Sequence, residues 1–232
     1  MSVSFYISLT TAVITAIFTI IIFAHDRGRR RKHLLAWGVG MALYSLSTLA
    51  QAYLFISFNE WVFKLWYWAG ALVVALWLGQ GTVFLLIRKG NRAMISFYFV
   101  LVSSIVGLVV MALSSVDPAV YQAGVDMTAQ YREIFTATGG AKTARTVLAI
   151  VLNSYGTLML VGGAAYSAFI FWRKRVLPHR MWGNVLIAVG GMLPAMGGVL
   201  VLLGNPAFKY IGQLLGGLLI FAGFLVATKG KH

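Results

Sequence analysis

Six side chains that could orient a bound molecule stand inside long apolar stretches of this sequence: Tyr44, Gln51, Trp66, Trp77, Gln80 and Asn153. A carboxamide, a phenol or an indole can each donate a hydrogen bond, and the carboxamide and phenol can also accept one. Helical spacing puts Tyr44 and Gln51 on one face, and Trp66, Trp77 and Gln80 on another. Two interpretations are open. The polar groups either line a cavity that holds an otherwise apolar ligand, or they join helices by hydrogen bonds.

Catalytic chemistry has few candidates in this chain. Cysteine is absent, which excludes disulfides, thiolate nucleophiles and cysteine-ligated metals. The apolar stretches hold no acidic or basic side chain and no histidine. The histidines lie near stretch ends or in the tail: His25, His33, His179 and His232. We therefore predict a non-enzymatic protein without a catalytic residue, a metal site or a cofactor.

The polar groups must be positioned by membrane-spanning helices. Charged residues divide the chain into seven apolar stretches, each near the length of about 20 residues that crosses a bilayer. A charge in the middle of a span costs about 2.5–3.5 kcal/mol, so the absence of charges is typical of spanning helices. The expected spans are residues 4–24, 34–58, 61–87, 93–114, 146–172, 181–203 and 207–228. The prediction is an all-α, polytopic bundle of seven transmembrane helices, forming one domain over residues 1–232.

Lysine and arginine predict the orientation. Fourteen of the nineteen lie in the connections after the first, third and fifth spans and in the tail after the seventh. The positive-inside rule places this side in the cytoplasm, so the N-terminus is expected outside and the C-terminus inside. The net charge of +14 is then explained by topology and by contacts with anionic membrane lipids, and no nucleic-acid partner is expected.

The longest connection, between the fourth and fifth spans, carries a helical pattern of its own. Asp117-Pro118 is typical of a helix start, apolar residues recur every three or four positions, and Gly139-Gly140 ends the pattern. We expect an amphipathic helix over about residues 118–138, on the outer membrane surface or over the mouth of the bundle.

Small residues predict close helix contacts. Gly183, Gly190 and Gly197 share a face of the sixth span with Pro194, and the seventh span carries a stripe of Gly212, Gly216 and Gly223. Small residues let helix backbones approach closely in lipid. The tryptophans at span ends are expected to anchor the bundle at the membrane interfaces: Trp37, Trp61, Trp172 and Trp182.

A weak internal repeat is compatible with three spans, one linking span and three further spans. Phe63-Lys64 opens the third span and Phe208-Lys209 opens the seventh. Parallel halves of this kind occur in some transporters.

Four stretches carry a resemblance to known sequences: Leu65-Trp66-Tyr67, Trp77-Leu78-Gly79-Gln80-Gly81-Thr82, Gly162-Gly163-Ala164-Ala165-Tyr166-Ser167-Ala168 and Gly183-Asn184-Val185-Leu186-Ile187-Ala188. Through these stretches the chain resembles a group of bacterial hypothetical seven-span membrane proteins without an assigned activity. The resemblance covers roughly residues 34–228. The resemblance implies the seven-span topology and a bacterial inner-membrane location, and it adds no site residue.

The sequence leaves three functions open. The first is a non-enzymatic membrane protein, either an accessory subunit of a larger membrane complex or a binder of an apolar ligand such as a lipid, a quinone or a carotenoid. The second is a facilitative transporter of a small neutral solute, which the possible repeat and the polar stripes favour. The third is a sensor whose basic cytoplasmic loops dock a partner. The expected partners are membrane lipids and other membrane subunits.

Overall fold

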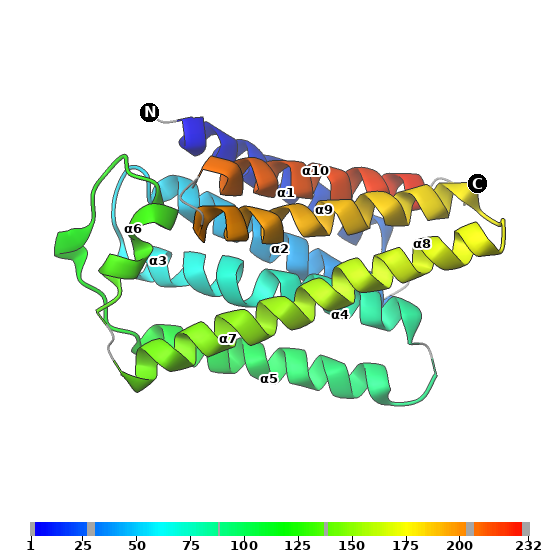
Figure 1. Ribbon diagram of the computed structural model, residues 1–232, viewed down its shortest axis with the longest axis horizontal. Coiled ribbons are helices and arrows are strands. Elements are labelled where there is room, and N and C mark those ends of the chain that lie inside the picture. Colours follow the sequence, from blue (N-terminus) through cyan, green and yellow to red (C-terminus); the bar gives the residue numbers. More distant parts are fainter. Residues whose placement is uncertain (1–2, 27–30, 88, 137–138, 203–206, 229–232) are drawn as a thin grey trace.

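The structure, a computed structural model, describes residues 3–26, 31–87, 89–136, 139–202 and 207–228, and these form a bundle of helices (Figure 1). The described part contains no strand beyond one bridge between Val116 and Phe135, so the all-α prediction is confirmed. The elements are α1 (Val3–His25), α2 (Lys32–Tyr53), α3 (Glu60–Tyr67), η1 (Trp68–Val73), α4 (Val74–Leu86), α5 (Arg92–Leu113), η2 (Pro118–Val120), α6 (Met127–Ile134), α7 (Gly140–Thr157), η3 (Leu158–Gly162), α8 (Gly163–Arg173), α9 (Pro178–Leu202) and α10 (Ala207–Thr228).

Six helical stretches in the described residues are long and apolar enough to cross a membrane. They are Val3–His25, Lys32–Tyr53, Glu60–Leu86, Arg92–Leu113, Gly140–Arg173 and Phe208–Thr228. Large apolar side chains remain exposed along them, as on α5 at Ile95, Val102 and Val109. An exposed apolar surface of this extent is typical of contact with lipid. The chain is therefore a multi-pass membrane protein. The sixth expected span, residues 181–203, corresponds to α9, which has 25 residues and is not among these six stretches.

Two expected span boundaries were wrong. The second helix ends at Tyr53 and not at residue 58, because Asn59 already begins the next helix by accepting hydrogen bonds from the backbone N–H groups of Trp61 and Val62. The fifth begins at Gly140 and not at residue 146. Arg145 lies inside this helix and does not mark its start, because the Arg145 guanidinium lies over the ring of Phe135, 3.6 Å from the ring centroid.

The amphipathic helix expected over residues 118–138 is also wrong in extent. The connection contains a short turn, η2, and an eight-residue helix, α6, separated by irregular chain. Gly124 adopts a positive φ of 80°, which interrupts a helix. The side chain of Gln130 then holds the irregular chain, bonding to the backbone N–H and C=O of Gln122 and to the C=O of Val125. We call residues 115–136 the cover segment.

The third and fifth spans each contain a π-helical segment near the middle, η1 and η3. The two spans cross where Gly79 on α4 meets Gly156 on α7, so closely that a Cβ at Gly79 would lie 2.7 Å from the Gly156 carbonyl oxygen. Nearby, the Asn153 amide donates to the carbonyl of Ala71 inside η1. A π-helical turn changes which carbonyls face a neighbouring helix, and here an amide on that neighbour binds one.

The close helix contacts expected at the glycines are found between α9 and α10. A Cβ at Gly183 would lie 2.6 Å from the Gly223 carbonyl oxygen, and one at Gly216 would lie 2.8 Å from both the Gly190 carbonyl oxygen and the ring of Pro194. The two backbones are therefore in direct contact at both levels.

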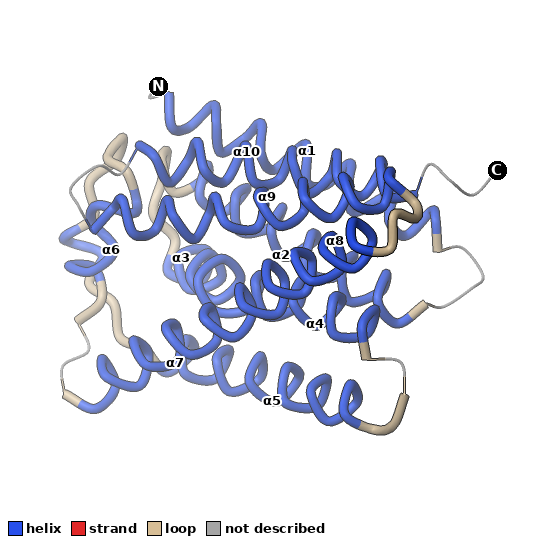
Figure 2. Tube along the Cα trace, turned by 45° about the vertical axis from the view of Figure 1, so that its right-hand side comes forward, coloured by secondary structure: helices blue, strands red, loops and turns tan. Residues whose placement is uncertain are grey.

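Six long helical stretches, α1, α2, α3 to α4, α7 to α8, α9 and α10, form a closed ring. In turn, α1 packs on α2, α2 on α4, α4 on α7, η3 and α8, α8 on α9, α9 on α10, and α10 on α1. The remaining long helix, α5, lies at one edge of the bundle, away from α1 and α10 (Figures 1 and 2). It packs mainly on η1, α4 and α7 through one face: Ala93, Val100, Ser104, Gly107 and Met111.

The ring has two different ends. At one, which we call the α6 end, the cover segment lies beside the starts of α1 and α3 (Figure 1). At the other lie the described ends of the connections that follow α1, α4 and α8, with most of the described lysines and arginines. We call this the pocket end, because a cavity opens there.

Candidate ligand-binding cavity

Three of the six sequence-predicted site residues meet inside the ring, toward the α6 end. The amide of Gln51 donates to the Ser8 hydroxyl at 2.8 Å and to the Gln213 side-chain oxygen at 3.2 Å, and its own oxygen accepts from the Trp66 indole at 3.0 Å. Tyr44 donates to the backbone carbonyl of Gln213 at 2.8 Å. These bonds join α1, α2, α3 and α10.

The other three residues lie elsewhere. Gln80 on α4 donates to the Ala93 carbonyl at 3.0 Å and accepts from Ser96 at 2.6 Å, which connects the ring to α5. The Trp77 indole donates to the Ser104 hydroxyl at 3.1 Å, also on α5. Asn153 connects α7 to η1, as described above.

The amides of Gln51, Gln80 and Asn153 are therefore all used in bonds between helices. Gln51 and Gln80 are fully buried, and a buried carboxamide with its hydrogen bonds satisfied is a stable packing element. This geometry favours the packing interpretation. A ligand-binding role for the six residues stays a prediction.

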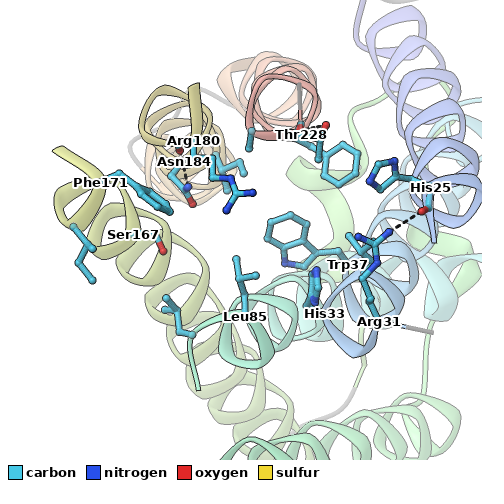
Figure 3. A pocket seen from close by; sticks show the side chains of 16 residues that line it. His25, Arg31, His33, Trp37, Leu85, Ser167, Phe171, Arg180, Asn184 and Thr228 are labelled. Carbon is cyan, nitrogen blue, oxygen red and sulfur yellow. Dashed lines mark hydrogen bonds between the residues drawn. The ribbon is translucent and has the colours of Figure 1, made fainter. Parts of the chain in front are cut away.

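A cavity of about 340 Å³ opens at the pocket end, on the axis of the ring. Figure 3 shows the lining side chains converging from opposite walls. Each of the six helical stretches of the ring contributes to the lining, with His25 from α1, Trp37 from α2, Leu85 from α4, Ser167 from α8, Asn184 from α9 and Thr228 from α10 among the contributors. None of the six sequence-predicted residues lines it.

The walls of the cavity are largely apolar. Trp37, predicted as an interfacial anchor, is buried and lines the cavity. Its indole donates to the Leu78 carbonyl at 3.0 Å, and its ring lies directly against Gly81, where any Cβ would collide with it.

The anchor prediction was therefore wrong for Trp37, because a glycine on α4 makes room for the ring inside the bundle. Trp61, Trp172 and Trp182 are exposed, as interfacial anchors would be.

The mouth of the cavity is basic. Arg31 is paired with Asp26, with 3.2 Å between the Arg31 Nε and an Asp26 oxygen, and it also donates to the His25 carbonyl. From the opposite wall the Arg180 guanidinium reaches toward Trp37 (Figure 3). Among the described residues Arg180 has no acidic partner. His33 lies near Trp37 and Leu85 (Figure 3).

The arrangement suits binding. Apolar walls with a few polar groups at one side are typical of small-molecule sites, whose volumes run from about 300 to 1,000 Å³. Among the described residues no three His, Asp or Glu side chains lie together to hold a metal ion. The one carboxylate beside the mouth, that of Asp26, is occupied by Arg31.

At the α6 end the cover segment packs on the ring. Met127 and Ile134 of α6 are fully buried in a cluster with Phe63 and Trp66 of α3. The Tyr121 hydroxyl donates to the Leu54 carbonyl at 2.9 Å, and the Gly124 N–H to the Phe55 carbonyl at 3.0 Å. The cover segment is thus bonded to the end of α2 and packed on α3.

Burial affects the ionisable groups of the cover segment. Desolvation raises the pKa of Asp126, and a hydrogen bond from Ser4 opposes that shift in part. A hydrogen bond to the Tyr131 hydroxyl raises the pKa of Arg132. Ser4 lies on α1, so Asp126 also connects the cover segment to the first span.

No family model and no curated protein matches this chain. The candidate site therefore rests on the geometry alone.

Sequence reasoning missed the cavity because its polar residues stand at span ends, where arginine is expected for topology alone. One signal did point there. On the fifth span the small and polar residues of the Asn153 face continue through Ala164 to Ser167, and Ser167 lines the cavity.

Proposed function

We propose that this protein is a non-enzymatic membrane protein that binds one apolar or amphiphilic molecule in the axial cavity. The observation that carries the proposal is the cavity itself, which is lined by all six spans of the ring. Of the ligand classes open from the sequence, a lipid or a quinone suits apolar walls with polar groups at one end. A long, rigid carotenoid fits a cavity of about 340 Å³ poorly.

Extraction in a mild detergent followed by native mass spectrometry tests this proposal. We expect a retained small molecule that is released on unfolding, and a rise in melting temperature on adding a matching ligand. A chain that emerges bare, and that no lipid or quinone stabilises, would contradict the proposal. A chain recovered with other subunits would favour the accessory-subunit role instead.

A facilitative transporter is the second candidate, and the ring favours it. The ring divides into the first three spans and the last three, with α5 outside, as a repeat of three spans, a linking span and three spans would give. The cavity opens at the pocket end while the cover segment packs on the α6 end, an asymmetry that one state of an alternating-access cycle would also have. Uptake of neutral solutes into liposomes would distinguish transport from binding.

We further propose seven spans, with α9 as the sixth, in the bacterial inner membrane. Support comes from the antiparallel packing of α9 on α10 and from the basic residues at the pocket end, which the positive-inside rule places in the cytoplasm. A reporter active only in the cytoplasm should work when fused after Lys231 and be silent when fused within residues 119–138. The reverse pattern would overturn the orientation.

A further inference from the structure

The charges around the cavity mouth are one-sided. The connections that reach the pocket end, residues 26–31, 87–91 and 174–177, contain Asp26 as their sole acidic residue. That carboxylate is 5% exposed and accepts from both the Nε and the backbone N–H of Arg31. Asp26 therefore neutralises Arg31 and leaves no carboxylate for the other cations at the mouth.

Of the two arginines that line the cavity, Arg180 is the one without an acidic partner among the described residues. It is half-buried on the first turns of α9, and its guanidinium points into the cavity (Figure 3). Its backbone carbonyl accepts from the Asn184 amide at 2.7 Å, which holds Asn184, one turn further along, beside it on the cavity wall. An arginine at an apolar wall favours an anion, because low polarity strengthens the attraction.

The apolar part of the cavity lies directly beyond these groups. Trp37, Leu85, Ile187 and Phe224 form its walls. With a volume of about 340 Å³, near the lower end of small-molecule sites, it suits one hydrocarbon chain better than a whole two-chain lipid.

We propose that the cavity takes an amphiphile with an anionic headgroup, a carboxylate or a phosphate, which binds Arg180 at the mouth while one hydrocarbon chain lies among Trp37, Leu85, Ile187 and Phe224. This inference rests on the proposed binding function and adds the class of the ligand. A free fatty acid and one chain of a phospholipid share this chemistry.

The test uses single-chain probes with one dodecyl chain and different headgroups. They are a carboxylate, a phosphate, an alcohol, a phosphocholine and a trimethylammonium, added to the purified full chain in nanodiscs of phosphatidylcholine. Binding is measured by equilibrium dialysis, and folding by the melting temperature. We expect the two anionic probes to bind at least tenfold more tightly than the alcohol, since a hydrogen bond to a charged group is worth a factor of this order.

Arg180→Gln should remove most of that difference while leaving the alcohol unchanged. Arg180→Lys, which keeps the charge and loses the planar guanidinium, should retain part of it. The matched control is Arg173→Gln, which removes the same charge from an exposed position at the end of α8 that does not line the cavity. It should leave the anionic preference intact.

The outcomes separate the two proposals. If no probe binds, the binding function itself fails. If the alcohol binds as tightly as the anions, or the trimethylammonium binds best, the function stands and the anionic headgroup is refuted. Equal loss of the preference in Arg180→Gln and Arg173→Gln would also refute a site at Arg180. A preference for the carboxylate over the phosphate would identify fatty acids as the source, and the opposite preference phospholipids.

Discussion

At the pocket end of the ring the axis is hollow, whereas at the α6 end it is filled by Gln51 and Trp66 and covered by residues 115–136. Both ends carry polar groups inside a membrane protein. At the α6 end those groups bond to one another. At the pocket end an arginine faces apolar walls with no acidic partner among the described residues.

The difference favours the pocket end over the α6 end as the place for a ligand. A buried polar group is stable when its hydrogen bonds are satisfied and costly when they are not. The side-chain amide of Gln51 has its hydrogen bonds satisfied by Ser8, Trp66 and Gln213. A ligand at Gln51 would therefore have to displace existing bonds. The Arg180 guanidinium can instead gain hydrogen bonds from a ligand that occupies the cavity beside it.

The largest expected effect on stability comes from breaking the filled end. Gln51→Leu should lower the free energy of unfolding by about 1–3 kcal/mol for each donor or acceptor left buried without a partner, and the Trp66 indole would be one of them. A melting curve of the purified protein measures the loss.

Two companion changes extend this test to the other amides. Gln80→Leu and Asn153→Leu should also destabilise the protein, because Ser96 and the Ala71 carbonyl lose their partners. None of the three should change the bound small molecule. If Gln80→Leu kept its stability and lost a ligand instead, Gln80 would line a binding cavity and the comparison of the two ends would fail.

Filling the hollow end should affect binding much more than stability. Ser167→Phe places a ring in the cavity beside Ile170 and Phe171. We expect retention of the native ligand to fall at least tenfold, since the volume it needs is occupied. The matched control is Ala165→Phe, two residues earlier on α8 and exposed, which should bind normally. Equal binding by both variants would place the ligand outside this cavity.

Much of the fold could be predicted from the sequence, because hydrocarbon imposes length, apolarity and internally bonded helices. The small-residue faces of α9 and α10 could be predicted from spacing, since small residues one and two turns apart lie on the same face, and the structure shows that the two faces meet. The boundaries at residues 58 and 146 were wrong because a charge was assumed to end a span. Arg145 stays inside the bundle on the ring of Phe135.

The cavity could not be predicted, because a cavity is a property of several helices at once. Gln51 and Gln80 were recognisable as unusual, yet their sequence neighbours do not reveal the partners Ser8 and Ser96. Likewise, nothing local distinguishes Arg180, which points into the ring, from Arg173, which does not. The packing of α9 against α8 and α10 decides that difference.

A smaller effect is expected within the cover segment. Gln130→Ala removes three hydrogen bonds to the irregular chain before α6. At about 0.5–1.5 kcal/mol for each bond, residues 121–126 should open more often. Hydrogen exchange of their amides should quicken, while exchange in the spans stays unchanged.

The control, Gln122→Ala, alters an exposed side chain and keeps the same backbone bonds. Faster exchange in both variants would mean that Gln130 does not hold the segment.

The smallest expected effect concerns pH. Desolvation raises the pKa of Asp126 above its ordinary value of 3.8, so the folded protein favours the protonated carboxyl. The stabilisation is therefore complete at low pH and is lost as pH rises from 3.8 through the raised value.

The side chain in Asp126→Asn stays neutral at every pH. The melting temperature of this variant relative to the native chain should therefore increase over that range and level off above it. Ser4→Ala removes the hydrogen bond that opposes the shift of the Asp126 pKa, so it should extend the upper end of the range to higher pH. A difference between Asp126→Asn and the native chain that does not change with pH would show that Asp126 is hydrated, and that the cover segment closes the α6 end less tightly than its contacts with Leu54 and Phe55 indicate.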